Sequence, residues 1–278
     1  MISATILKYK PPLDWNRLLN FLSPRAIRNV ESVNPEALTL RRTLSLEGQA
    51  GWLESRIDTS QHQIHLQHSS HFPSYEIEAK VTRVFDLTAP VAALEKLFPG
   101  HAGLRVPGAW DSFEMGVRAI LGQQVSVKAA HTLAARLVEN WGDPIDTPWP
   151  EISRVFPAPE RLASLSASEL RSIGLTESRA QTLLGFAQWS ALAPGQRPPL
   201  LSLRGIGPWT ESYFRMRSGE DRDAFPAGDL GVQKALALEK PGSPRAQKQA
   251  LEAAEAWRPL RSYAVMLLWS SLANKERI

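Results

Sequence analysis

A pair of glycines between two helical stretches constrains the fold of this chain most strongly. In residues 203–210, which read Leu-Arg-Gly-Ile-Gly-Pro-Trp-Thr, Gly205 and Gly207 flank one aliphatic residue. Glycine accepts backbone angles that other residues resist, which permits a very tight turn. Pro208 suits the first turn of a helix, where its missing N–H costs nothing. The segment therefore predicts helix, tight hairpin and helix, with the second helix running from about Pro208 to Arg217.

Such a hairpin is able to bind a phosphate group. The backbone N–H groups at the turn and at the start of the second helix lack partners within the helix, and they bind anions without reading a base sequence. An isolated Gly-x-Gly pair more often joins two helices and binds nothing. Other features of the sequence are needed to distinguish these two interpretations.

The composition limits the class of protein. Apolar residues make up 43% and charged residues 22% of the 278 residues, which is ordinary for a globular chain large enough for two domains. The net charge of +4 is compatible with a polyanionic partner. The absence of cysteine excludes disulfides, thiolate zinc sites and an iron–sulfur cluster bound by thiolates. Since the chain shows neither a membrane-length apolar run nor a leader, we expect a cytoplasmic protein without a membrane anchor.

Residues 1–90 predict an antiparallel sheet with covering helices. Asp14 is suited to cap a short helix that ends before Pro24. A helix from about Tyr75 to Leu87 is placed to cover one face of the sheet. Alternating apolar and polar residues, separated by turn-prone residues, predict strands within three segments: 38–46, 52–57 and 63–67.

Four histidines recur at every third position between residues 62 and 71, namely His62, His65, His68 and His71. On a strand, His62 and His68 point to one face and His65 points to the other. A zinc site needs ligands that converge, so this spacing disfavours metal binding. We expect polar histidines at the edge or surface of the sheet.

Residues 91–278 predict an all-helical domain, with the hairpin at about 198–217. Apolar stripes follow capping residues at Asp111 and Ser126, and residues 166–169 resemble a capping box. Between the first two helices lie Gln123 and Gln124, which are either solvated amides or side chains that enter a DNA groove. The proline-rich residues 147–159 predict a surface loop.

A loop with two carboxylates, residues 223–231, follows the hairpin. Asp229 precedes a predicted helix, where an N-cap aspartate is common. A cap can also act in chemistry, because the helix end keeps the carboxylate ionised and fixes its direction. Trp209 and Tyr213 are four residues apart and share one helical face. They are either core residues or the lining of a pocket for a flat base.

The hairpin followed by Asp229 resembles the helix-hairpin-helix and Gly/Pro…Asp signature of base-excision DNA glycosylases. The resemblance to the DNA-3-methyladenine glycosylase II family (AlkA type) extends over nearly the whole chain. It implies an α+β fold, with an N-terminal sheet like half of the TATA-binding protein and a helical glycosylase core. Four blocks in the right order carry it: Pro11–Trp15, Val84–Leu87, Gly116–Gln123 and Trp257–Ala264.

The resemblance also implies roles for individual residues. Asp229 matches the catalytic aspartate, and the residues that match the base-pocket aromatics are Trp209, Tyr213, Trp269 and Phe21. Residues at the DNA-contacting positions are Gln123, Gln124, Gly205, Gly207 and Thr210, with Gln124 standing where the enterobacterial form has a leucine wedge. The family binds a monovalent cation through hairpin carbonyls, which here belong to Leu201, Leu203 and Ile206. No other cofactor is expected.

These residues predict a monofunctional glycosylase that removes alkylated purines such as 3-methyladenine from double-stranded DNA in base-excision repair. Alkylation at a ring nitrogen makes the purine a cationic leaving group, so a fixed carboxylate that stabilises the sugar cation is sufficient. We expect a monomer in the bacterial cytosol. One alternative is a bifunctional glycosylase/lyase, although Trp209 stands at the position of the lyase lysine. The other is a helix-hairpin-helix protein that binds damaged DNA without cutting it.

Overall fold

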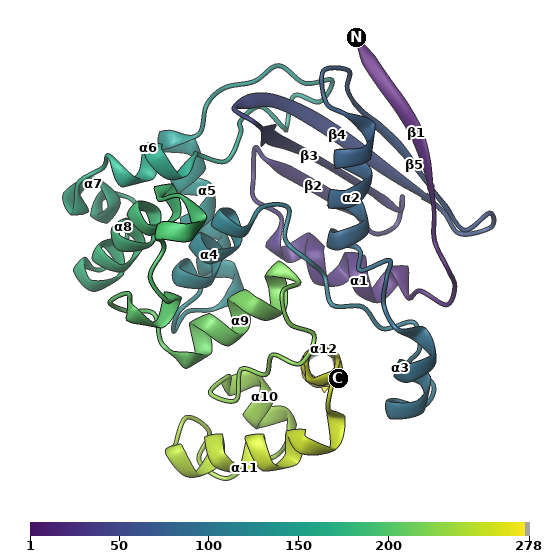
Figure 1. Ribbon diagram of the computed structural model, residues 1–278, viewed down its shortest axis with the longest axis vertical. Coiled ribbons are helices and arrows are strands. Elements are labelled where there is room, and N and C mark those ends of the chain that lie inside the picture. The colour runs from purple at the N-terminus through teal and green to yellow at the C-terminus, as the bar shows by residue number, and fades with distance from the viewer. Residues whose placement is uncertain (276–278) are drawn as a thin grey trace.

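The chain begins with a five-stranded antiparallel sheet, which the computed structural model describes together with the rest of residues 1–275. The strand order is β1-β5-β4-β3-β2, and every neighbouring pair is antiparallel (Figure 1). The sheet confirms the α+β prediction for the N-terminal part. Its strands are β1 (Ile2–Lys8), β2 (Glu31–Asn34), β3 (Thr39–Leu46), β4 (Gln49–Asp58) and β5 (Gln63–Ser69).

The sequence did not predict β1 and β2. In β1 the usual alternation is inverted, because Ile2 and Ile6 face solvent while Ser3 and Thr5 lie toward the covered side. The hydroxyl of Thr5 donates a hydrogen bond to Glu78 of the covering helix. The second strand has four residues and no fully buried side chain, so it carries little hydrophobic signal.

One face of the sheet is covered by α1 (Trp15–Leu22) and α2 (Ser74–Val84), and Figure 1 shows α2 lying across it. Asp14 caps α1 as predicted, since its carboxylate accepts the N–H of Arg17. The predicted helix 75–87 ends at Val84, because Asp86 adopts a φ of 48° that an α-helix does not allow. Fully buried side chains join sheet and helices: Leu19, Leu53, Ile64, Leu66, Ile77 and Val81.

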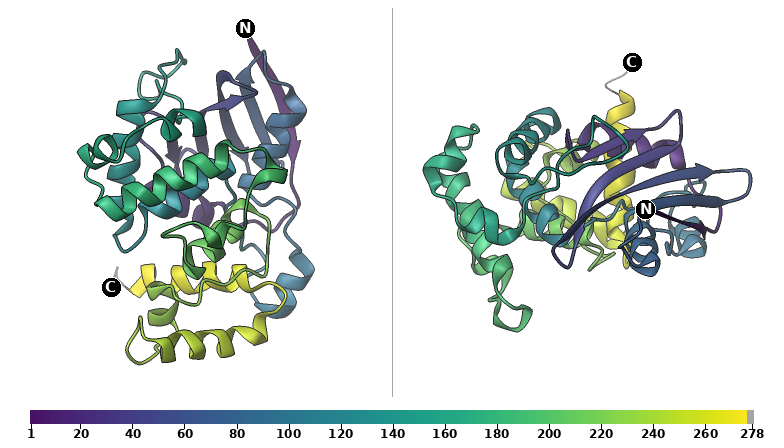
Figure 2. Two further views of the ribbon diagram at one scale, coloured as in Figure 1. Left: turned by 60° about the vertical axis from the view of Figure 1, so that its left-hand side comes forward. Right: turned by 90° about the horizontal axis from the view of Figure 1, so that it is seen from above.

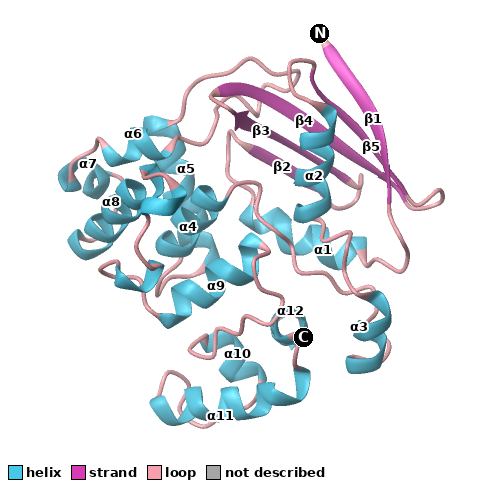
Figure 3. Ribbon diagram, in the orientation of Figure 1, coloured by secondary structure: helices cyan, strands magenta, loops and turns pink. Residues whose placement is uncertain are grey.

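The remainder of the described chain is helical (Figure 3). Asp111, Ser126 and the Ser166–Glu169 capping box begin helices as predicted. The first group is α3 (Val91–Leu97), α4 (Ser112–Leu121), α5 (Val127–Trp141), α6 (Pro159–Ala163), α7 (Ala167–Ser172) and α8 (Glu177–Ala191). The second is α9 (Pro208–Ser218), α10 (Leu230–Ala235), α11 (Pro244–Ala254) and α12 (Arg261–Lys275). Among these residues, no helix is both long and apolar enough to cross a lipid bilayer.

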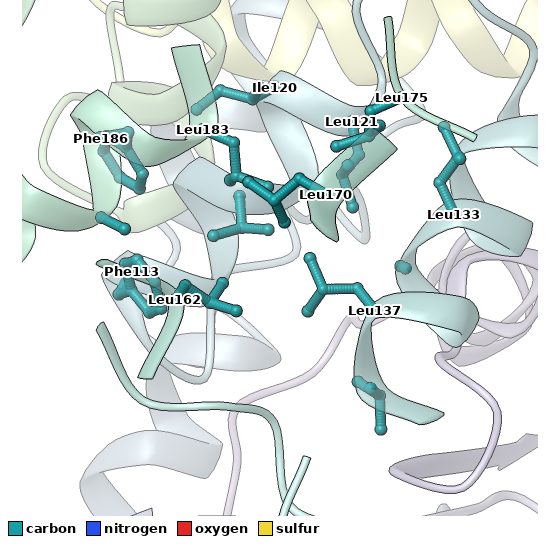
Figure 4. Close-up of a cluster of buried hydrophobic side chains, with 14 of the residues drawn as sticks. Phe113, Ile120, Leu121, Leu133, Leu137, Leu162, Leu170, Leu175, Leu183 and Phe186 are labelled. Atoms are coloured by element: carbon teal, nitrogen blue, oxygen red, sulfur yellow. The ribbon is translucent and has the colours of Figure 1, made fainter. Parts of the chain in front are cut away.

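Two apolar cores hold the helices together. One lies among α4 to α8, where Phe113, Leu137 and Leu183 are among the side chains in Figure 4. The other joins α12 to the loop after α3, with Tyr263 and Leu104 buried in it. In Figure 1, α9 lies between α4 and the C-terminal helices, and the views of Figure 2 place α6–α8 away from the sheet. This arrangement leaves the site residues between the two cores.

The proline-rich segment 147–159 was predicted as a surface loop, and this prediction is wrong for part of it. Ile152 is fully buried and forms a β-bridge with Asn29. Trp149 packs edge-on against Trp52 of β4, with 5.0 Å between the ring centroids. The segment thus packs on the sheet face opposite α2, and apolar residues among the prolines account for its burial. We call residues 142–155 the strap.

The four histidines lie in different environments, and no group of residues suited to metal binding occurs within residues 1–275. His62 and His65 are exposed, but His68 is fully buried, which corrects the expectation of surface histidines. Its ring nitrogens lie 2.9 Å from the Ser69 carbonyl and 3.1 Å from the Ser74 hydroxyl. These bonds satisfy the imidazole and connect β5 to the start of α2.

A buried ring of four charges joins the sheet to α4. Arg42 of β3 lies 2.7 Å from Glu31 of β2 and 2.8 Å from Glu114 of α4. Arg118, one turn after Glu114, lies 2.6 Å from each of the same two carboxylates. Burial raises the pKa of Glu114, but the two guanidiniums outweigh that effect and lower its pKa to about 2. Glu114 is therefore ionised at neutral pH.

Because the folded pKa of Glu114 lies below its ordinary value of 4.5, its charge contributes stability above pH 4.5 that is lost as the pH falls toward about 2. Removing the charge by Glu114→Gln leaves Arg42 and Arg118 with one carboxylate between them. We expect this to lower the free energy of unfolding at pH 7 by about 3–5 kcal/mol, as measured by urea denaturation. The variant should also lose less stability than wild type between pH 4.5 and pH 2.

Glu139→Gln is the matched control, since Glu139 forms an exposed ion pair with Arg28. It should change the free energy of unfolding by less than about 1 kcal/mol. Equal effects of the two substitutions would show that the buried ring contributes no more than a surface pair.

Candidate active site

Asp229 lies at the start of α10 with both carboxylate oxygens hydrogen-bonded. The backbone N–H of Val232 donates to Oδ1 at 2.9 Å, as in an ordinary N-cap. The indole N–H of Trp269 donates to the same oxygen, and that of Trp209 donates to Oδ2, each at 3.0 Å. The carboxylate is half-buried. Three donors from α9, α10 and α12 therefore fix both its position and its direction.

The four aromatic side chains predicted to line a base pocket lie together beside this carboxylate. Trp209 and Tyr213 of α9 are stacked, with 5.4 Å between ring centroids and 17° between planes. Phe21, from α1 of the sheet domain, is nearly parallel to Trp269 at 6.1 Å. Trp209, Tyr213, Trp269 and Asp229 line a cavity of about 490 Å³. Trp209, Tyr213 and Trp269 are therefore cavity residues, whereas Phe21 packs against Trp269 and is not part of the cavity lining.

Two arginines at this site were missed by sequence reasoning. The guanidinium of Arg25 lies 3.8 Å from the ring centre of Phe21, and that of Arg217 lies 5.0 Å from it. Arg217 also donates a hydrogen bond to the Tyr213 hydroxyl at 3.0 Å. Each arginine is four residues after its aromatic partner, and that spacing was the available signal. Both line the cavity.

The two arginines affect which of the aromatic rings can attract a cationic ligand. Burial lowers the pKa of Arg25 to about 10, so its guanidinium stays protonated at neutral pH. Since protein cations already contact the ring of Phe21, that ring is suited to stacking more than to attracting a cationic ligand. Trp209 and Trp269 have no such contact with an arginine among the described residues. Cation–π attraction to a cationic ligand would therefore come mainly from these two indoles.

The glycine turn forms where predicted and α9 begins at Pro208, but the predicted helix before the turn is only a three-residue 3-10 turn, Leu200–Ser202. Gly205 has a φ of +82°, and a Cβ there would lie 1.9 Å from the hydroxyl oxygen of Thr182 on α8. Gly207 has a φ of −105° and open space around it. The requirement for glycine is thus strict at Gly205 and weak at Gly207.

The remaining hairpin residues differ in exposure. Leu201 is exposed, whereas Ile206 and Thr210 are buried. The carbonyl of Leu203 accepts the N–H of Ile206 at 3.1 Å, which closes the turn. A role of the carbonyls of Leu201, Leu203 and Ile206 in holding a cation stays a prediction.

The glutamine pair separates into two different environments. Gln124 is exposed and has a φ of +54°. The side-chain amide of Gln123 instead donates to the carbonyl of Gly205 at 2.9 Å and lies 3.0 Å from the hydroxyl oxygen of Thr210. Sequence reasoning predicted both glutamines at the DNA surface, and the structure places the Gln123 amide against the hairpin.

The glycine geometry leads to a paired stability prediction. Gly205→Ala puts a methyl group into Thr182 and into a left-handed backbone conformation, and we expect it to cost about 2–4 kcal/mol of unfolding free energy. Gly207→Ala meets neither obstacle and should change stability by less than about 1 kcal/mol. Thermal and urea unfolding of both variants measure the difference. Similar losses in the two would mean that the hairpin is flexible enough to absorb the clash.

Comparison with known proteins agrees with this geometry. Residues 4–111 match the AlkA N-terminal domain family, and residues 117–259 match the HhH-GPD superfamily of base excision DNA repair proteins. The chain is 34% identical to DNA-3-methyladenine glycosylase 2 of Escherichia coli strain K12 over 95% of each protein. The chain belongs to this glycosylase family. The predicted family, fold and enzyme class are thereby confirmed.

More distant relatives share the architecture. The chain is 29% identical to DNA-3-methyladenine glycosylase of Bacillus subtilis strain 168, over 71% of this chain and 69% of that protein. The structure of 3-methyladenine DNA-glycosylase from Archaeoglobus fulgidus matches with a TM-score of 0.76 at 24% identity, over 95% of this chain and 97% of that one. The 8-oxoguanine glycosylase/lyase of Clostridium acetobutylicum matches with a TM-score of 0.70 at 14% identity, over 99% and 98%. The fold is therefore shared by glycosylases with and without "lyase" in their names.

Proposed function

We propose that this protein is a monofunctional DNA glycosylase that removes alkylated, cationic purines such as 3-methyladenine from double-stranded DNA. It hydrolyses the N-glycosidic bond after the base has left the helix stack and entered the aromatic cavity. The observation that carries the proposal is Asp229, held by three N–H donors beside Trp209 and Trp269. A helix N-cap requires one backbone N–H donor, so capping does not explain the two indole donors.

The chemistry follows from the charges. A purine alkylated on a ring nitrogen leaves without prior protonation, so the site needs no general acid. As the bond breaks, the sugar gains oxocarbenium character, and a fixed carboxylate stabilises that positive charge. Asp229 can also orient the attacking water. The indole faces of Trp209 and Trp269 attract a cationic base by about 0.5–2 kcal/mol each.

DNA engagement is assigned to the hairpin and the turn after α4. The N–H groups of the hairpin bind backbone phosphates, which positions the duplex without reading its sequence. Gln124, which is exposed and lies in the chain between the cavity-lining residues Gly122 and Val125, fills the space that the flipped nucleotide leaves. The related C. acetobutylicum enzyme has a structure with double-stranded DNA, which supports DNA as the partner. A monovalent cation on the carbonyls of Leu201, Leu203 and Ile206 would strengthen phosphate binding there.

The central test is Asp229→Asn. Asparagine caps a helix about as well as aspartate, but its amide N–H group opposes one of the indole donors, so we expect a stability loss of about 1 kcal/mol. The negative charge is gone, and excision of 3-methyladenine should fall by at least ~100-fold, or roughly 2.7 kcal/mol. Affinity for duplex DNA should hold or increase. Release of free base under single-turnover conditions measures the effect.

Asp14→Asn is the matched control. Asp14 caps α1 through the same type of bond to a backbone N–H, and it is not among the residues that line the cavity. Asp223 is less suitable, because it forms salt bridges with Arg258 and Arg261. A folded Asp229→Asn protein that releases alkylated base at nearly the wild-type rate would reject the assignment.

The bifunctional alternative makes a different prediction. A lyase needs a lysine that forms a covalent imine with the sugar. The hairpin has Trp209 at that position, and among the side chains that the structure describes, residues 1–272, no lysine lines the cavity. Borohydride added during turnover should therefore trap no protein–DNA adduct above background, as judged by denaturing electrophoresis. A trapped adduct would favour the lyase.

The non-catalytic alternative is a protein that recognises damaged DNA without cutting it. An aspartate facing DNA lowers affinity, and a pure binding protein gains nothing from three donors that hold it in place. The same base-release assay separates the two functions. A monomer in the bacterial cytosol stays part of the proposal.

A further inference from the structure

The turn between α4 and α5 is attached to the hairpin by one side chain. The amide nitrogen of Gln123 donates to the carbonyl of Gly205 at 2.9 Å and lies 3.0 Å from the Thr210 hydroxyl oxygen. Arg179 of α8 donates to the backbone carbonyl of Gln123. Gln123 is therefore held through both its side chain and its backbone. Its chain neighbour Gln124 makes no hydrogen bond that the structure assigns within residues 1–275.

The partners of Gln123 are themselves fixed. The bare backbone of Gly205 packs against Thr182 so closely that a single added carbon would overlap it. Thr210 is buried in the first turn of α9. Helix α4 packs against both α8 and α9, and Figure 1 shows the three helices close together. The hydrogen bonds of Gln123 therefore join elements that are already packed around α4.

The conformation of Gln124 depends on this attachment. Its φ of +54° lies in the left-handed region, which costs a residue other than glycine about 1–2 kcal/mol. Such a conformation persists where neighbouring residues hold the backbone in place. Gln123 on one side and the Ser126 cap of α5 on the other provide that support. The backbone of the exposed Gln124, between the cavity-lining residues Gly122 and Val125, is thereby held in one conformation before DNA arrives.

We propose that Gln123 is a positioning residue for base flipping, which keeps the tip residue Gln124 in register with the phosphate-binding hairpin. The inference rests on the proposed function and extends it to a residue that does not touch the base. Pre-organisation of this kind lowers the cost of filling the gap in the duplex, because the tip is not ordered at the moment of binding. The proposal predicts that loss of the Gln123 side chain slows the extrusion of a paired base. It predicts no effect on the breaking of the glycosidic bond.

The test compares two duplexes that each carry one 7-methylguanine, either paired with cytosine or opposite an abasic-site analogue. An unpaired base costs less to extrude. Single-turnover release of base is measured for wild type, Gln123→Ala, Gln124→Ala and the double variant. Gln181→Ala is the matched control, since the Gln181 side chain is exposed on α8 and bonds only Glu177 one turn away. Gln123→Met keeps the length of the side chain without its donor, and it replaces Gln123→Ala if that variant unfolds.

We expect Gln123→Ala to slow release from the paired duplex by about tenfold, as the loss of two neutral hydrogen bonds implies, and to leave the unpaired duplex within twofold of wild type. Adding Gln124→Ala should cause little further loss, because both substitutions act on the same step. Gln181→Ala should match wild type on both duplexes.

Two results overturn the inference while the proposed function stands. One is an equal loss of base-release rate on both duplexes, which would show that Gln123 supports the residues that break the glycosidic bond. The other is a fully additive double variant, which would mean that Gln123 and Gln124 act separately. If wild type releases base from neither duplex, the proposed function itself fails, and the inference fails with it.

Discussion

The architecture depends on the buried ring of Glu31, Arg42, Glu114 and Arg118. Two members come from the sheet and two from α4, and each side contributes one carboxylate and one guanidinium. Two of the ion pairs, Arg42–Glu114 and Arg118–Glu31, cross from the sheet to α4. Such a ring need not add net stability relative to an apolar core, but the two crossing pairs require one register of the sheet against α4.

Charged contacts continue from the ring to the candidate active site. Arg118 also donates a hydrogen bond to the carbonyl of Arg25 at 2.7 Å. Arg25 in turn donates to the carbonyl of Phe21 and stacks over its ring. Arg25, which lines the cavity, is thus placed by the N-terminal part of the chain through charged contacts, while Trp209 and Trp269 come from α9 and α12. The N-terminal part therefore contributes to the candidate site, whereas Asp229 lies in the helical part.

Local chemistry made much of this structure predictable. The hairpin, the caps at Asp111 and Ser126 and the cap at Asp229 follow from residue types at short spacing, and the structure has all four. The inverted alternation of β1 could not be predicted from the sequence, because it depends on the neighbouring strand and α2. The ring of charges joins residues up to 87 positions apart, and a local sequence pattern does not reveal pairs at that separation.

The site also contains some features that the sequence predicted and others that it did not. Helical spacing placed Trp209 and Tyr213 together, whereas Trp269 and Phe21 came from family resemblance alone. The two indole donors to Asp229 were not foreseen, because they require α9 and α12 to approach the same carboxylate from different directions. Gln123 was interpreted as a DNA contact because its spatial neighbours, Gly205 and Thr210, are more than 80 residues away in the chain.

The long sequence separations also bear on how the protein is made. As the chain leaves the ribosome, the sheet strands emerge first, yet the strap that covers part of the outer face and the two charges of α4 follow much later. The last helix supplies both Trp269 and Tyr263, and the Tyr263 hydroxyl donates to Asp86, 177 residues earlier, at 2.7 Å. The cavity wall at Trp269 and one of the three donors to Asp229 come from α12, so a chain that ends before α12 cannot assemble this site.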